Sequence, residues 1–187
     1  DATTVLLAAT PSVAEGGTIV YTATLSSAAL TPMTVALSNG ATIAIAAGAT
    51  SGSTSVAAPD DDVVIDAGSV SATIASSSGG GFESLSINST AATTTVSDTI
   101  DVTTATHTAT PSVAEGGTIT YTVALGAPVT GSDVTVTLAN GQTVTIPVGS
   151  SSGNVATAVA DNVFAGGGSV SNSIASIGGG NFEQLTP

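Results

Sequence analysis

A long internal repeat is the feature that most constrains how this chain of 187 residues folds. The segment TPSVAEGGTI occurs at Thr10–Ile19 and again at Thr110–Ile119, an offset of 100 residues. The segment GSVS keeps the same spacing, at Gly68–Ser71 and Gly168–Ser171. A period of this length is too long for a solenoid coil, so it favours two independently folding domains in tandem.

Alternation of apolar residues with threonine predicts β-strands in both copies. In the second copy, Ile119, Tyr121 and Val123 share one face of a strand, and Asn140-Gly141 is the preferred two-residue hairpin turn. In the first copy we expect strands at about 3–9, 18–25, 33–38, 41–46, 53–58, 69–75 and 91–98. We therefore predict an all-β chain of two tandem immunoglobulin-like β-sandwich domains.

The domains are expected at residues 1–98 and 102–187, with a short linker at 99–101. The counterpart of Asn88–Asp98, the expected last strand of the first repeat, is missing from the second repeat. We therefore expect the chain to be a fragment of a longer array. We also expect an unpaired sheet edge near Gly180–Pro187, because a missing strand leaves its neighbour without a hydrogen-bonding partner.

The charged side chains are all acidic: 13 Asp and Glu residues stand against no Lys or Arg. Nucleic acid is excluded as a partner, because nothing in the chain can neutralise phosphates. The same imbalance argues against docking on anionic lipid, and we expect no direct membrane insertion. The absence of cysteine excludes disulfides and thiolate chemistry. Cations remain as the charged partners that the composition allows.

Strand direction predicts that several acids meet at one end of the first repeat. Because antiparallel strands alternate between two ends, the turn at Glu15, the loop with Asp61 and Asp62, and the end of the last strand at Asp98 share one end. Asp101 lies in the linker that follows. By the same reasoning, Glu183 lies at the end of the second repeat that faces this linker.

Carboxylates that crowd together without a basic partner repel each other, and a hard cation with oxygen ligands relieves the repulsion. Zinc and copper are disfavoured, since the chain has no Cys and one His. We therefore predict that calcium binds at the junction. The candidate ligands are Glu15, Asp61, Asp62, Asp98, Asp101 and Glu183. An isolated acid such as Asp133 is expected to be only a solvated surface residue.

Several segments together resemble a known family. They are TPSVAEGGTITYT, the Asn-Gly hairpin, GGNFEQL at Gly179–Leu185 and TTTVSDTID at Thr93–Asp101. They resemble the extender repeats of giant Gram-negative RTX adhesins of the LapA type. The resemblance implies an extracellular protein of the bacterial cell surface that serves adhesion and biofilm formation, with tandem domains made rigid by calcium. Neighbouring identical repeats of the same chain are the expected partners, and we expect a monomer.

Three other functions agree less well with the sequence. We expect no enzyme activity, because the single histidine, His107, is replaced by Leu7 in the first repeat and no catalytic arrangement accompanies it. Ice binding would need a regular threonine ladder, which a period of 100 residues does not supply. The main alternative is a surface immunoglobulin-like module that recognises a sugar or a protein. With 3% aromatic residues, the chain has little material for sugar stacking.

Overall fold

The computed structural model describes residues 1–163 and 165–187, and their regular elements are all β-strands. The chain divides into two compact units. Unit 1 comprises Asp1–Asp61 with Asp66–Thr99, and unit 2 comprises Asp62–Ile65 with Ile100–Pro187. The division after Thr99 falls inside the linker that we expect at 99–101. No described segment forms a helix that is long and apolar enough to cross a membrane.

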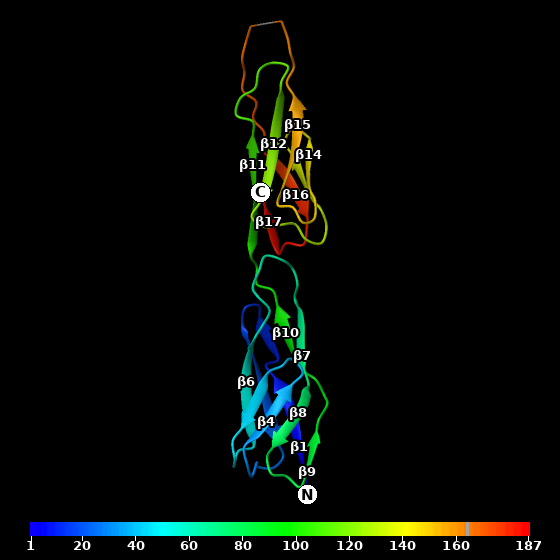
Figure 1. The fold of residues 1–187 in the computed structure, drawn as a ribbon. Coiled ribbons are helices and arrows are strands. Elements are labelled where there is room, and N and C mark those ends of the chain that lie inside the picture. Colours follow the sequence, from blue (N-terminus) through cyan, green and yellow to red (C-terminus); the bar gives the residue numbers. More distant parts are fainter. Residues whose placement is uncertain (164) are drawn as a thin grey trace. The chain divides into compact units, whose positions relative to one another are not determined.

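Unit 1 is a β-sandwich whose strands form three hydrogen-bonded groups (Figure 1). One sheet has the order β6-β3-β1-β9, another has the order β5-β4-β8, and the third has the order β2-β10-β7. The strands are β1 (Ala2–Ala9), β2 (Ser12–Ala14), β3 (Thr18–Leu25), β4 (Met33–Leu37), β5 (Thr42–Ile45), β6 (Ser51–Ala57), β7 (Gly68–Ala72), β8 (Ile74–Gly79), β9 (Ser84–Ile87) and β10 (Ala92–Ser97).

The core of unit 1 follows from the period of two in its strands. In β3, Ile19, Tyr21 and Ala23 are buried, while the residues between them point away from the core. The expected Asn39-Gly40 hairpin connects β4 and β5, and Gly40 takes the positive φ of 86° that such a turn requires. The predicted all-β sandwich is confirmed.

The strand list differs from the sequence-based expectation at three places. The expected single strand at 69–75 is two strands, because the chain changes sheets at Thr73: β7 pairs with β10, and β8 pairs with β4. The two short strands β2 and β9 were not expected. Both pair in parallel, β2 with β10 and β9 with β1.

Unit 2 repeats much of this arrangement with fewer strands. Its sheets have the orders β15-β12-β11-β17 and β14-β13-β16. The strands are β11 (Val102–Ala109), β12 (Thr118–Leu125), β13 (Val134–Leu138), β14 (Thr143–Ile146), β15 (Ser152–Ala158), β16 (Ile174–Gly179) and β17 (Gln184–Thr186). Among the described residues of unit 2, no strand corresponds to β2, β7 or β10 of unit 1.

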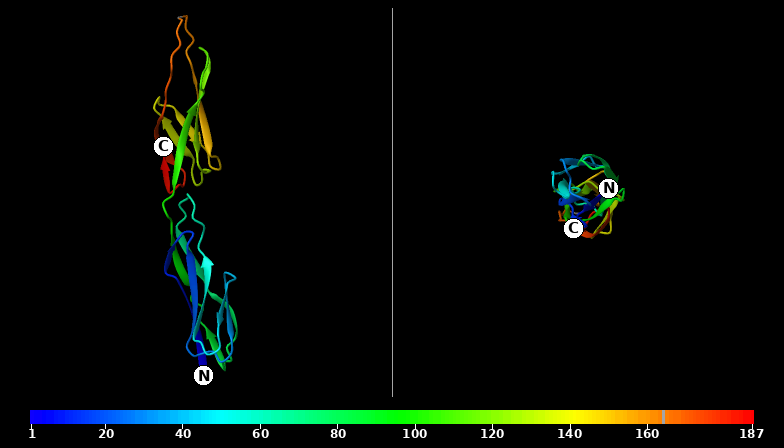
Figure 2. Two further views of the ribbon diagram at one scale, coloured as in Figure 1. Left: turned by 90° about the vertical axis from the view of Figure 1, so that its left-hand side faces the viewer. Right: turned by 90° about the horizontal axis from the view of Figure 1, so that it is seen from below.

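The unpaired edge in unit 2 does not lie where we expected it. Residues Gln184–Thr186 form β17, which pairs in parallel with β11 from Val102 to Thr104, as β9 pairs with β1 in unit 1 (Figure 2). The expectation of an unpaired edge near Gly180–Pro187 was therefore wrong. Residues 112–114 and 168–172 are instead the ones that lack the strand pairing of their unit 1 counterparts.

Candidate metal centre

The turn between β2 and β3 places Glu15 at the end of β10. The amide of Glu15 donates a hydrogen bond to the carbonyl of Ser97 at 3.1 Å, and the amide of Gly16 donates to the carbonyl of Pro59 at 2.7 Å. Gly16 has a φ of +65°, and a Cβ atom there would lie 3.2 Å from the Cβ of Asp61. Glycine is therefore required for the turn to pack against the loop that contains Asp61.

The carboxyl group of Glu15 lies among other acids of unit 1. Glu15 is 5% exposed, and its Oε2 atom is buried with no hydrogen-bond partner in the described part of the chain, as is Oδ1 of Asp98. A carboxylate oxygen of Glu15 and one of Asp98 lie within 4.8 Å of each other. A hydrogen bond with Asp66, burial and a hydrogen bond with Asp98 together raise the pKa of Glu15 to about 8.

This group of three carboxyls, which we call the unit 1 acid cluster (Glu15, Asp66 and Asp98), needs a positive charge or a proton near neutral pH. The protein has no Lys or Arg to supply the charge. A proton on Glu15 is one solution, and its raised pKa reflects this. The other solution is a hard cation, for which carboxylate oxygens are the preferred ligands. Buried oxygens of Glu15 and Asp98 that have no partner among the described residues are available to such a metal ion.

Asp61 and Asp62 are already engaged by neighbouring groups. Within unit 1, the hydroxyl of Thr99 donates a hydrogen bond to Oδ1 of Asp61. Asp62 belongs to unit 2, where its Oδ1 accepts a hydrogen bond from the amide of Val64 at 2.6 Å. This bond to the residue two positions ahead closes an Asx turn, so one oxygen of Asp62 shapes its own loop.

Asp101 and Glu183 come together within unit 2. The amide of Asp101 donates a hydrogen bond to Oε2 of Glu183 at 2.7 Å. Oε1 of Glu183 is buried and has no hydrogen-bond partner within residues 1–163 and 165–187. Unit 1 repeats this contact, since the amino group of Asp1 lies 2.5 Å from Oε2 of Glu83. The Glu of the GGxFE segment thus contacts the start of its own repeat in both units. A single site that joins the acids of both units stays a prediction.

Two features of this region were not predicted from the sequence. Asp66 was not among the candidate ligands, yet it is the group that most raises the pKa of Glu15. The apolar run from Val63 to Ile65 was also overlooked. In unit 2 it pairs with residues 181–183: the amide of Ile65 donates to the carbonyl of Asn181 at 3.0 Å. Three β-branched residues within an acidic loop were the available signal.

Two β-sandwich units encoded by one repeated sequence, without cysteine or basic residues, define a tandem all-β repeat protein. The family model of the LapA domain matches residues 1–99 and again residues 101–187. The chain therefore belongs to the LapA domain family, which supports its identification as a LapA-type adhesin module. A search of curated proteins found no match to the chain.

Proposed function

We propose that the chain is a spacer segment of a large bacterial surface adhesin and that calcium stiffens the connection between successive domains. The observation that carries the calcium proposal is the unit 1 acid cluster, in which buried carboxylate oxygens of Glu15 and Asp98 have no hydrogen-bond partner among the described residues. Membership of the LapA domain family supports the placement in an adhesin. The spacer would project a distal adhesive domain for attachment and biofilm formation.

In this proposal, Glu15, Asp66 and Asp98 bind the ion from the first domain. Glu183 supplies oxygen from the second domain through Oε1, which has no hydrogen-bond partner among the residues that the structure describes. Asp101 contributes by holding Glu183 in place through its amide. Calcium takes about six to eight oxygens, so three or four carboxylates and water suffice. Asp61 and Asp62 serve the surrounding loops.

The expected energetic effect is modest. Extracellular modules bind calcium with dissociation constants of roughly 0.1–1 mM. At about 1 mM calcium, the tighter value stabilises the bound form by about 1.4 kcal/mol, which is too little to fold a domain. It corresponds to a roughly tenfold shift between a hinged and a rigid linker. The switch therefore acts on the connection between domains.

The test is calcium titration by calorimetry together with small-angle scattering. We expect binding near millimolar calcium, and we expect the Asp98→Asn variant to weaken it while both domains stay folded. Glu115→Gln is the matched control, because Glu115 is the exposed counterpart of Glu15 in the second repeat. Calcium should narrow the range of interdomain distances in the scattering profile, and Glu183→Gln should reduce this effect. The absence of binding up to about 10 mM calcium would overturn the proposal.

The alternative function, a module that recognises a sugar, is not favoured by the positions of the aromatic side chains. Tyr21, Tyr121 and Phe182 are buried, and Phe82 is partly buried against the core of unit 1. Sugar recognition needs an exposed aromatic face. The described Tyr and Phe residues therefore act mainly as core residues.

A further inference from the structure

A short stretch of the first repeat's sequence is folded as part of unit 2. The chain leaves unit 1 after Asp61, returns to it after Ile65 and leaves it again after Thr99. We call Asp62–Ile65 the inserted segment. The two units are therefore joined by three peptide connections, of which only the last lies in the linker expected from the sequence.

Within unit 2, the inserted segment forms an antiparallel pairing beside Phe182. Val64 forms a β-bridge with Phe182. The amide of Ile65 donates a hydrogen bond to the carbonyl of Asn181 at 3.0 Å, and the side-chain amide of Asn181 donates to the carbonyl of Ile65 at 2.8 Å. The segment is thus held in the way that a sheet holds a strand.

The inserted segment also fixes the backbone of Glu183. Val63 packs against the hydrophobic core of unit 2, in which Phe182 is buried. The amide of Glu183 donates a hydrogen bond to the carbonyl of Val63 at 3.0 Å. Glu183 is the proposed calcium ligand of the second domain, so a residue of the first repeat's sequence helps to position it.

The two ends of the inserted segment are held by groups of unit 1. Just before the segment, Asp61 accepts a hydrogen bond from the hydroxyl of Thr99. Just after it, Asp66 forms a hydrogen bond with Glu15. Successive Cα atoms are joined by a planar peptide and lie about 3.8 Å apart, so Asp66 cannot shift far without moving Ile65. The unit 1 acid cluster therefore restrains the segment.

The inserted segment has a turn of its own that passes this restraint on. The amide of Val64 donates a hydrogen bond to Oδ1 of Asp62 at 2.6 Å. An Asx turn of this kind limits the backbone conformations of the residues that it encloses. The segment is thus a short, constrained element, and restraining its ends restrains the carbonyl of Val63 and the amide of Ile65 as well.

We propose that the inserted segment couples the unit 1 acid cluster to unit 2, so that calcium bound by carboxylates of unit 1 strengthens the attachment of Val63 and Ile65 within unit 2. This inference rests on the proposed calcium binding and adds the element that transmits it. Coupling of this kind is reciprocal, so loosening the segment weakens calcium binding. Its size cannot exceed the effect of the ion itself, which is about tenfold at about 1 mM calcium.

The experiment measures hydrogen exchange in the whole chain, labelled with ¹⁵N, with and without about 1 mM calcium. The reporters are the amides of Ile65 and Glu183, which donate the two backbone hydrogen bonds of the pairing. We expect calcium to slow the exchange of both amides by up to about tenfold, because each must open before it exchanges. Calorimetry on the same samples measures calcium binding separately.

Val63→Ala and Val56→Ala are a matched pair of variants. Both valines are half-buried and belong to the first repeat, but Val56 packs against the core of unit 1 and Val63 against the core of unit 2. Val63→Ala should speed the exchange of the two reporter amides by about fivefold, because it removes packing that holds the segment. It should also weaken calcium binding, by no more than that factor. Val56→Ala should change neither quantity.

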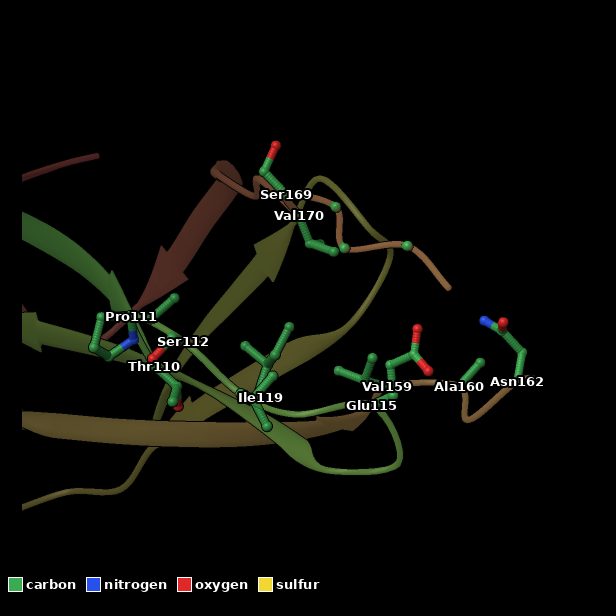
Figure 3. A pocket seen from close by; sticks show the side chains of 15 residues that line it. Thr110, Pro111, Ser112, Glu115, Ile119, Val159, Ala160, Asn162, Ser169 and Val170 are labelled. Carbon is green, nitrogen blue, oxygen red and sulfur yellow. The ribbon is translucent and has the colours of Figure 1, made fainter. Parts of the chain in front are cut away.

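Val170→Ala is a second control, placed in unit 2. Val170 is 68% exposed and lines an open cavity of about 650 Å³ together with Ile119 and Val159 (Figure 3). Residues 62–65 and 181–183 do not line this cavity. This variant should therefore leave the reporter amides and the calcium affinity unchanged.

The possible failures are distinguishable. If calorimetry detects calcium binding but the reporter amides exchange equally fast with and without calcium, the coupling is wrong and the proposed function stands. The same holds if Val63→Ala binds calcium as tightly as Val56→Ala does. If calorimetry detects no calcium binding, the proposed function is wrong and the coupling is overturned with it.

Discussion

Lowering the pH should weaken calcium binding through one carboxyl group, that of Glu15. Calcium binds the ionised carboxylate, so a proton on Glu15 must leave before the ion binds. The hydrogen bond with Asp66, burial and Asp98 raise the pKa of Glu15 to about 8. Below this pH, the group is increasingly protonated and the apparent calcium affinity falls with the ionised fraction.

The size of the effect follows from that pKa. About half of the Glu15 carboxyls are ionised near pH 8, and about 1% are ionised near pH 6, so the apparent affinity should fall by about 50-fold between these values. Calorimetry at the two pH values measures the ratio directly. Repeating it in buffers of different ionisation enthalpy counts the protons released, and we expect more release near pH 6 than near pH 8.

Two variants separate Glu15 from the rest of the molecule. Glu15→Gln should bind calcium more weakly and should lose most of the pH dependence in this range. Glu115→Gln should keep both the affinity and the pH dependence, because Glu115 is exposed and the counterpart of Asp66 in its repeat is Gly166. Equal calcium affinity at both pH values in the unchanged protein, or full pH dependence in Glu15→Gln, would refute the reasoning.

Three further predictions concern stability. Without calcium, the first domain should lose stability as pH rises from about 4.5 towards 8, because its folded state holds a proton on Glu15 that the unfolded chain releases. In thermal unfolding across this range, the melting temperature of Glu15→Gln should depend less on pH. Val96→Ala, at a buried position of β10, should cost about 1–2 kcal/mol in denaturant unfolding of the first domain. Gly79→Ala should lower the free energy of unfolding more than Gly40→Ala in the same assay, although both glycines have positive φ. A Cβ at Gly79 would lie 2.2 Å from the carbonyl oxygen of Pro32, whereas a Cβ at Gly40 meets nothing within 4 Å. Equal costs for the two glycines would contradict the last of these.

Much of the fold was predictable because the apolar period of two is strong where strands are buried on one face. The expected strand at 18–25 coincides with β3, and the hairpin at Asn39-Gly40 is present. The period does not reveal the hydrogen-bonding partner. Val70, Ala72 and Ile74 continue one alternation through Thr73, yet the chain changes sheets there. The short strands β2 and β9 were missed because a few residues carry too little pattern.

Part of the candidate site was also predictable from the pattern of strands. Strand direction correctly placed Glu15 and Asp98 together, because it depends only on the number of strand reversals. The choice among the loop acids was less successful. The candidate ligands included Asp61, whose carboxylate accepts a hydrogen bond from Thr99, and omitted Asp66, which forms a hydrogen bond with Glu15. Loop conformation decides which carboxylate turns inward, and the sequence pattern does not contain that information.

The parallel pairing of β2 with β10 and of β1 with β9 affects how unit 1 carries tension. When the two ends of the unit are pulled apart along the strands, these terminal strands slide past each other. Their hydrogen bonds share the load and break together, whereas an antiparallel hairpin pulled at its open end peels one bond at a time. Stretching single molecules should therefore record one abrupt rupture for unit 1. In unit 2 the described parallel pairing is the short one of β11 with β17, so unit 2 as described here should yield at lower force.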